Sequence, residues 1–314
     1  MVETKENDRE RAGTVGNKKV TSPAYLAKIL QERGLAPRRS KGQHFLVDEN
    51  IRGRILTAAS LEESDYVLDI GAGPGALSLA MAEKVAGVIA VEQDRGLVQL
   101  LKDQAAMRGF AHLQIVEGDV RRLDLAEICR KHWERAFCPE TEKQNIKVVA
   151  NLPYYLTTPL LFQLLQGALP LKSLVLMVQL EVARRMSAEA GQKDYGLLSI
   201  LCSYYTNPRF LFKVSRSVFY PRPAVDSAVV LLEVLPAPAV QVSREDFFWR
   251  IVRAAFQKRR KTILNALDGI ESLGKACWRE LLEKADIMPG RRGETLSLVE
   301  FAKLSEILYN KSVP

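Results

Sequence analysis

The chain has 314 residues, enough for one large domain, alone or with a small second domain. Hydrophobic residues make up 47% and charged residues 26% of the chain, which excludes a wholly disordered protein. The formal net charge of +8 suggests an anionic partner. The four cysteines lack a C-x-x-C spacing and the three histidines are scattered, so we expect neither a disulfide framework nor a metal site.

Basic residues concentrate at the two ends of the chain. Residues 1–43 carry a net charge of +5 and residues 241–314 one of +4, whereas residues 44–240 are nearly neutral at −1. Nothing near the N-terminus resembles a signal peptide, and no apolar stretch approaches the length of a membrane span. The sequence therefore predicts a reduced, cytoplasmic protein that does not associate with a membrane.

The spacing of apolar residues predicts an α/β fold. A first helix begins at Ser22 and Pro23 and ends at Gly34. Between about residues 48 and 178, short apolar strands alternate with helices, which is typical of a mostly parallel sheet covered on both faces. A strand-like run at 228–234 is expected to close this sheet.

The chain divides into three predicted parts. Residues 1–20 are polar, and we expect them to form a disordered tail. Residues 21–240 hold the first helix and the sheet, which together make the large domain. A proline-containing hinge at 235–238 follows the last strand, and amphipathic helices follow the hinge. Residues 241–314 are therefore predicted to form a small helical domain.

A glycine-rich turn follows the first strand of the predicted sheet. Gly71 and Gly73 allow a tight bend and let a ligand approach the end of the strand. Glu92 lies at the tip of the next strand, where it could accept hydrogen bonds from both ribose hydroxyls of an adenosine-containing ligand. Asp119 ends the third strand and could accept from an adenine amino group. This pattern fits a nicotinamide cofactor as well as S-adenosylmethionine, so it leaves the cofactor open.

The fourth predicted strand ends in the sequence Asn151-Leu152-Pro153-Tyr154. The exocyclic amine of adenine is a poor nucleophile, because its lone pair is delocalised into the ring. The Asn151 side-chain oxygen and the Leu152 carbonyl could hold its N–H groups in a more nearly tetrahedral geometry, and Pro153 restricts Leu152 to an extended conformation. Tyr154 offers a flat face to an extruded base. This corner predicts methylation of an adenine amine by positioning and electrostatics, and it favours S-adenosylmethionine.

With these motifs the chain resembles the ribosomal RNA adenine N6,N6-dimethyltransferase family, in particular its bacterial small-subunit members. The resemblance runs from about residue 37 to the C-terminus and implies a Rossmann-like methyltransferase sheet with a small C-terminal helical domain. It implies dimethylation of two adjacent adenosines in the 3′-terminal hairpin of 16S rRNA, within the small ribosomal subunit or its precursor. The segments that carry it are 42–46, 69–75, 118–119, 151–155, 179–185, 195–199, 218–228 and 255–261.

The resemblance also implies roles for single residues. The cofactor is expected to contact His44, Leu46, Gly71, Gly73, Glu92, Asp119 and Asn151. Position 44 commonly holds Asn in this family, so His44 departs from the pattern. Tyr154 and Phe219 are expected to sandwich the target adenine. Basic residues that could bind RNA phosphates are Arg184, Arg185, Arg222, Lys258, Arg259, Arg260 and Lys261.

Other functions remain open at this point. A resistance-type methyltransferase of large-subunit ribosomal RNA shares the expected fold and chemistry, although the ending Val225–Ala228 and the run 258–261 favour the small-subunit enzyme. A ribosome-assembly or transcription factor could keep the fold without turnover. A nicotinamide-dependent oxidoreductase is disfavoured, because no residue near Asn151 suits hydride transfer. Nothing in the sequence calls for more than a monomer, which is what we expect.

Overall fold

The computed structural model describes residues 20–38, 42–133, 146–258 and 260–312. The chain forms two compact units. The first holds the residues up to Leu180 together with Leu211–Leu231, and the second holds Glu181–Phe210 together with the residues from Leu232 onward. The predicted tail lies outside the described residues except for Val20, which is buried. The functional division at about residue 240 stays a prediction.

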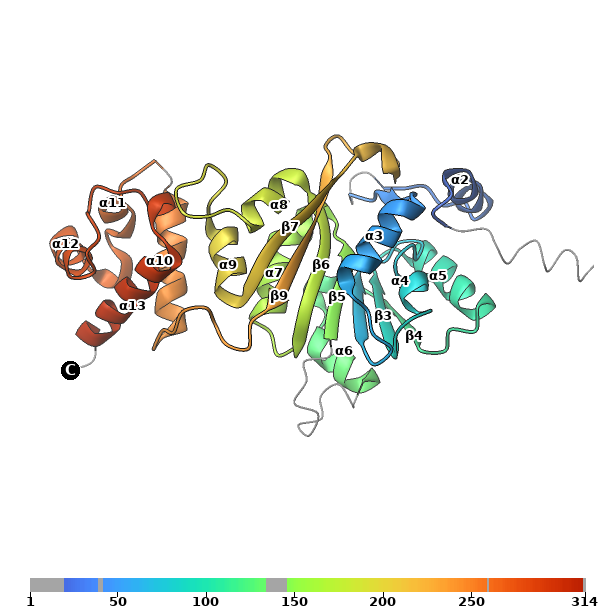
Figure 1. The fold of residues 1–314 in the computed structure, drawn as a ribbon, viewed down its shortest axis with the longest axis horizontal. Coiled ribbons are helices and arrows are strands. Elements are labelled where there is room, and N and C mark those ends of the chain that lie inside the picture. The colour runs from blue at the N-terminus through green and yellow to red at the C-terminus, as the bar shows by residue number, and fades with distance from the viewer. Residues whose placement is uncertain (1–19, 39–41, 134–145, 259, 313–314) are drawn as a thin grey trace, which may run out of the picture. The chain divides into compact units, whose positions relative to one another are not determined.

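The described residues form a seven-stranded sheet in the order β4-β3-β2-β5-β6-β9-β7. Four neighbouring pairs are parallel: β2 with β3, β3 with β4, β2 with β5, and β5 with β6 (Figure 1). Its strands are β2 (Tyr66–Ile70), β3 (Gly87–Glu92), β4 (Leu113–Glu117), β5 (Ile146–Asn151), β6 (Leu171–Gln179), β7 (Thr206–Val214) and β9 (Ser227–Val234). The predicted parallel sheet is therefore confirmed for β2 to β6.

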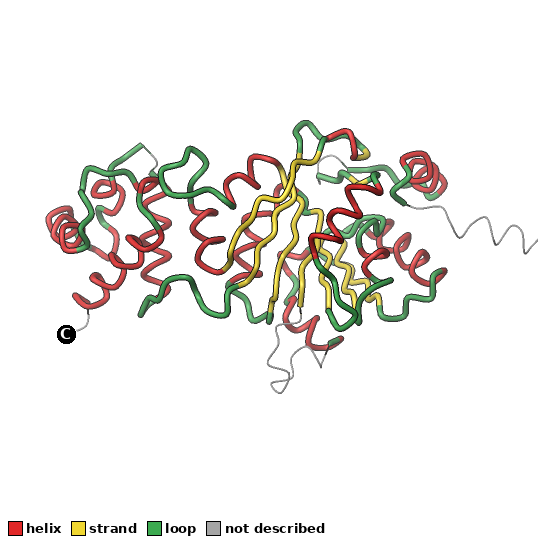
Figure 2. The backbone as a smooth tube through the Cα atoms, in the orientation of Figure 1, coloured by secondary structure: helices red, strands yellow, loops and turns green. Residues whose placement is uncertain are grey.

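The central strands are mostly apolar because helices cover both of their faces. Val67 and Leu68 in β2 and Val148 and Val149 in β5 are all fully buried, although successive side chains in a strand point to opposite faces. Figure 2 shows these strands between helical segments. The helices of the first unit are α2 (Pro23–Glu32), α3 (Glu49–Ala59), α4 (Ser78–Met81), α5 (Arg95–Met107), α6 (Leu125–His132) and α7 (Thr157–Leu165).

Aspartate side chains cap the N-termini of several of these helices. The Asp94 carboxylate accepts from the backbone N–H groups of Gly96 and Leu97 at the start of α5, and Asp48 accepts from Ile51 N at the start of α3. Because α5 begins immediately after β3, the Asp94 cap also fixes where the end of that strand turns away from the sheet.

The sheet differs from the prediction at one edge. We expected the run 228–234 to close it, but β9 lies between β6 and β7, and β7 forms the edge. β7 contains Pro208 and polar residues, and its burial is irregular, so it lacks the apolar run of a buried strand. A second, two-stranded sheet pairs β1 (Phe45–Leu46) with β8 (Phe219–Tyr220) in antiparallel fashion. No local sequence signal predicts the position of β9 between β6 and β7 or the pairing of β1 with β8.

The helices predicted near the C-terminus are confirmed. In α10, buried Phe248, Ile251, Val252 and Ala255 follow helical spacing and make one apolar face. The second unit also contains residues before the predicted hinge, because α9 belongs to it. Its helices are α8 (from Leu180 to Met186), α9 (Leu197–Tyr205), α10 (Glu245–Gln257), α11 (Ile263–Leu267), α12 (Lys275–Lys284) and α13 (Leu298–Ser312).

Candidate active site

A cavity lies at the carboxyl ends of the adjacent parallel strands β2 to β5. It encloses about 870 Å³, counted with the solvent at its mouth, and all its lining residues belong to the first unit. Carboxyl ends of parallel strands meet at one edge of a sheet, where α/β proteins bind ligands. Predicted site residues that line it are His44, Leu46, Gly71, Gly73, Glu92, Asp119, Asn151, Leu152, Pro153 and Tyr154.

The glycine turn is fixed to the end of β3 by backbone hydrogen bonds. The N–H groups of Gly71 and Ala72 both donate to Val91 O, at 2.8 and 3.2 Å. Gly71 has a φ of +75°, and a Cβ there would lie 3.0 Å from the Pro153 ring. Only glycine combines this left-handed backbone with so close a neighbour. The turn and the Asn-Leu-Pro-Tyr corner are therefore packed together.

Glu92 organises the floor of the cavity with its carboxylate. One oxygen accepts from Gly73 N at 2.9 Å, and the other accepts from the N–H groups of Gln93 and Asp94 at 2.8 and 2.9 Å. Burial raises the pKa of Glu92, and these three hydrogen bonds oppose that rise. They occupy three of about four lone-pair directions on the carboxylate. Hydrogen bonds from both ribose hydroxyls to Glu92 stay a prediction. Both hydroxyls would have to share the remaining lone-pair direction of the carboxylate.

A second buried carboxyl group lies just before the glycine turn. Asp69 ends inside the cavity and accepts a hydrogen bond from the Ser78 hydroxyl. Burial raises the pKa of Asp69 to about 7, the Ser78 hydrogen bond opposes this, and the nearby Glu92 charge adds to it. Two carboxyl groups that are costly to ionise therefore face one pocket, and a cationic ligand would stabilise both.

Asp119, the predicted acceptor for an adenine amino group, forms hydrogen bonds with Arg121. Its carboxylate accepts from Arg121 N at 3.1 Å and from the Arg121 guanidinium, and this hydrogen bonding lowers the pKa of Asp119 to about 2. Asp119 is thus ionised at neutral pH and remains an acceptor, but any adenine amine shares it with Arg121. No sequence signal indicated that Arg121 folds back onto this carboxylate. Its expected contact with adenine stays a prediction.

Three residues beside the predicted ligands connect the strand ends at the mouth of the cavity. Gln93 follows Glu92, and its side-chain amide donates to Tyr155 Oη at 3.0 Å. The Arg121 guanidinium carbon lies 5.8 Å from the centre of the Tyr155 ring. The loops after β3, β4 and β5 are therefore linked through Tyr155. The sequence did not predict this link, because Tyr155 stood out only as part of the 151–155 motif.

The amide of Asn151 has a fixed orientation. Its Nδ2 donates to the backbone oxygen of His44 at 2.9 Å, so its Oδ1 is the end that remains for a ligand. Among the described residues, no donor bonds Asn151 Oδ1 or the Leu152 carbonyl oxygen. Two adjacent acceptors are therefore available at the corner, and their bonding to a target amine stays a prediction.

Tyr154 is anchored beside these acceptors. Its hydroxyl lies 2.9 Å from Ser227 Oγ, and its ring stacks near that of His44, with centroids 5.8 Å apart and planes 29° apart. His44 Nδ1 donates to Pro221 O at 2.7 Å. His44 thus connects the Asn-Leu-Pro-Tyr corner to the segment after β8 through both its backbone and its ring. Ser227 lies in the 218–228 motif, but no local sequence signal predicts its hydrogen bond with Tyr154.

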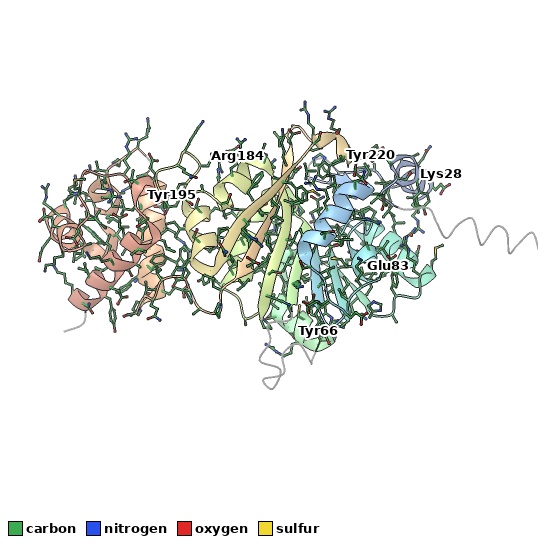
Figure 3. All side chains as sticks on the ribbon, viewed as in Figure 1. Lys28, Tyr66, Glu83, Arg184, Tyr195 and Tyr220 are labelled. Atoms are coloured by element: carbon green, nitrogen blue, oxygen red, sulfur yellow. The ribbon has the colours of Figure 1, made fainter. Side chains whose placement is uncertain are left out.

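The prolines at 221 and 223 predict a loop around Phe219, but Phe219 is a strand residue. It forms β8 opposite Leu46, and its side chain is 4% exposed and packs in the core. Strand alternation sends the neighbouring Tyr220 outward, where it is 38% exposed (Figure 3). The sandwich of adenine between Tyr154 and Phe219 stays a prediction, and Phe219 does not line the cavity.

The candidate RNA-binding residues fall in both units. Arg184 in α8 is exposed (Figure 3), and Arg185 forms an ion pair with Glu181. Lys258, Arg260 and Lys261, which follow α10, are exposed in the second unit, whereas Arg222 is exposed in the first. Arg259 lies outside the described residues. Their RNA contacts stay predictions.

Neither a metal cluster nor a membrane span is found in the described part of the chain. Within it, no group of three or more His, Cys, Asp or Glu side chains could hold a metal ion. No helix in the same residues is long and apolar enough to cross a bilayer.

The strand order and a cavity at the carboxyl ends of β2 to β5 place the chain among the Rossmann-like α/β methyltransferases. A family model described as ribosomal RNA adenine dimethylase matches residues 34–304. The chain therefore belongs to the ribosomal RNA adenine dimethylase family.

Known relatives cover nearly the whole chain. It is 47% identical over 289 residues to ribosomal RNA small subunit methyltransferase A of Pelotomaculum thermopropionicum, covering 91% of this chain and 96% of that one. It is 46% identical to the protein of the same name from Moorella thermoacetica, covering 92% and 98%. Among solved structures, a dimethyladenosine transferase from Plasmodium falciparum superposes with a TM-score of 0.70 at 26% identity, covering 85% and 98%.

Proposed function

We propose that the protein transfers methyl groups from S-adenosylmethionine to the N6 amines of two adjacent adenosines in the 3′-terminal hairpin of 16S rRNA. The observation that carries the proposal is the Asn151 amide, which His44 O orients so that Oδ1 stays free beside the Leu152 carbonyl. The substrate is the small ribosomal subunit or its precursor, and the relatives named as small subunit methyltransferases support this choice.

The cavity suits S-adenosylmethionine by its charge. The buried carboxyl groups of Asp69 and Glu92 favour a ligand that is cationic and rich in hydroxyl donors. Asp119, kept ionised by Arg121, suits an amino group. When bound, S-adenosylmethionine supplies an electrophilic methyl group on a positively charged sulfur. The loop at His44 and Leu46 is proposed to cover the cofactor, with Gly71 and Gly73 beneath it.

The protein's own groups then position the target amine. Asn151 Oδ1 and Leu152 O accept hydrogen bonds from its two N–H groups. This geometry reduces the delocalisation of the nitrogen lone pair into the adenine ring. Tyr154 supports the extruded base, with its hydroxyl held by Ser227. This chemistry needs positioning and acceptor dipoles but neither a metal nor a strong base. We propose that the protein acts as a monomer in the cytoplasm.

Basic residues of both units are proposed to hold the RNA backbone. They are Arg184, Arg185, Arg222, Lys258, Arg259, Arg260 and Lys261. Each phosphate contact releases condensed counterions, so the affinity for the substrate should fall steeply with salt. Residues 241–314 would then serve mainly as an RNA-binding domain, together with α8.

Small subunits that lack the modification provide the direct test. Incubation with labelled S-adenosylmethionine, followed by nucleoside analysis, is expected to yield N6,N6-dimethyladenosine within the 3′-terminal hairpin. Large subunits are incubated in parallel. Label in large subunits alone would favour the resistance-type enzyme, and label in neither would leave a binding factor without turnover.

Binding of S-adenosylmethionine is expected to strengthen as the pH rises towards 7. Burial raises the pKa of Asp69 to about 7, so below that pH its carboxyl group is protonated and a cationic ligand must displace the proton. The affinity should rise by up to about tenfold per pH unit and level off above pH 7. Calorimetry between about pH 5.5 and pH 8.5 measures this dependence. Asp69→Asn should flatten it, and an unchanged slope in that variant would refute the assignment.

A further inference from the structure

None of the residues from Phe219 to Ser227 lines the cavity, but this segment is bonded to residues that do. Near its start, Pro221 O accepts from His44 Nδ1 at 2.7 Å. At its end, Ser227 Oγ lies 2.9 Å from the hydroxyl of Tyr154. Backbone pairing of β8 with β1 holds the same segment against Leu46. The segment therefore has a fixed position next to the residues proposed to hold the target adenine.

Further contacts hold the part of this segment around residues 224–226 in place. Arg216 donates from its backbone N–H to Asp226 and from its guanidinium to Ala224 O, at 3.1 and 2.8 Å. Lys213 forms an ion pair with Asp226 at 2.7 Å. A group that projects from such a braced segment loses little conformational freedom when it binds a ligand.

Tyr220 projects from the segment into solvent. Its side chain is 38% exposed, whereas Phe219 beside it is 4% exposed. Arg222, two residues on, is exposed and forms no ion pair with any described residue. Val225 is 45% exposed in the same segment. An aromatic ring next to an unpaired cation is the combination by which proteins hold single-stranded nucleic acid.

We propose that Tyr220 stacks on the base of a nucleotide that flanks the target adenosine, while Arg222 contacts a phosphate of the same strand. The inference rests on the proposed function, because it needs a nucleic-acid substrate. Extruding one base into the cavity leaves its neighbour without a stacking partner on one side. Tyr220 immediately precedes Pro221, whose carbonyl bonds His44 beside the residues proposed to hold the target adenine, so its exposed ring is near enough to take the place of the lost stacking partner. Sequence-tolerant stacking would suit either of two adjacent adenosines.

Tyr220→Ala is expected to raise the KM for unmethylated small subunits about tenfold, with kcat and the Kd for S-adenosylmethionine unchanged within about twofold. A direct readout uses an RNA hairpin with two adjacent loop adenosines, in which 2-aminopurine replaces the flanking nucleotide on one side or the other. With S-adenosylhomocysteine present to prevent turnover, wild-type protein should quench the fluorescence at one of these positions. Tyr220→Ala should lose the quenching.

Two variants control this experiment. Tyr220→Phe keeps the ring and should behave as the wild type in both measurements. Phe210→Ala removes an aromatic side chain of similar exposure, 40%, from β7 outside the segment, and should change neither. Unchanged KM or unchanged quenching in Tyr220→Ala would overturn the inference. Absence of methyl transfer by the wild-type protein would instead overturn the proposed function, and the quenching would still report on stacking.

Discussion

Asn151→Ala is expected to lower kcat for methyl transfer by about 10²- to 10³-fold, the usual loss when one oriented polar group is removed from a developing charge. The amine gains positive charge as it is methylated, and Asn151 Oδ1 is one of two acceptors available to stabilise it. The His44 carbonyl fixes this amide before substrate binds, so no reorganisation is needed during the reaction. The Kd for S-adenosylmethionine should change by less than about tenfold, because most of the cavity is unaltered.

Single-turnover methylation of unmethylated small subunits measures this loss, and calorimetry measures cofactor binding. Asn151→Asp is the informative companion variant. It keeps an acceptor oxygen but loses the N–H that bonds His44 O, so its rate should lie between those of wild type and Asn151→Ala. Normal dimethylation by Asn151→Ala would exclude the mechanism.

The sequence predicted those parts of the site that depend on short segments. Gly71 follows β2, whereas Glu92 and Asn151 are the last residues of β3 and β5. Parallel strands bring these ends together whatever the detailed packing. The central sheet was predictable for the same reason, since its strands consist mostly of apolar residues. A pattern within about ten residues was sufficient in each case.

Contacts between distant segments were not predictable. The pairing of Phe45 with Tyr220 joins residues far apart in the chain, and two-residue strands have no periodicity to detect. The buried ion pair between Lys147 and Asp65, at 2.6 Å, likewise lies in what reads as an ordinary strand and turn. No local pattern predicts the pairing of Arg121 with Asp119, because only the folded turn brings the two side chains together.

The correction at Phe219 has the same physical origin. Its motif is rich in proline, which predicts an exposed loop, but pairing with Leu46 makes it a strand residue. Alternation then buries Phe219 and exposes Tyr220. Which aromatic faces the solvent depended on a register that only the partner strand determines.

Glu92→Gln is expected to weaken S-adenosylmethionine binding about 100-fold. The carboxylate of Glu92 accepts from the N–H groups of Gly73, Gln93 and Asp94, and an amide replaces one of its oxygens by a donor. If the amide oxygen keeps the two bonds to Gln93 and Asp94, its NH₂ group faces Gly73 N. A buried donor left without an acceptor costs about 1–3 kcal/mol, and the glycine turn would shift to relieve it. The proposed ribose acceptor and the shape of the turn are thus lost together.

Glu117→Gln is the matched control for this variant. Glu117 lies directly opposite Glu92 in the register of β3 and β4, but it is exposed and pairs with Arg95 at 3.0 Å. Exposed pairs contribute little, so this change should leave the Kd within about twofold of wild type. Calorimetry with S-adenosylmethionine and S-adenosylhomocysteine compares both variants with the wild type. Equal affinities for Glu92→Gln and wild type would show that the acidic tip of β3 does not bind the cofactor, and would require another residue to recognise the ribose.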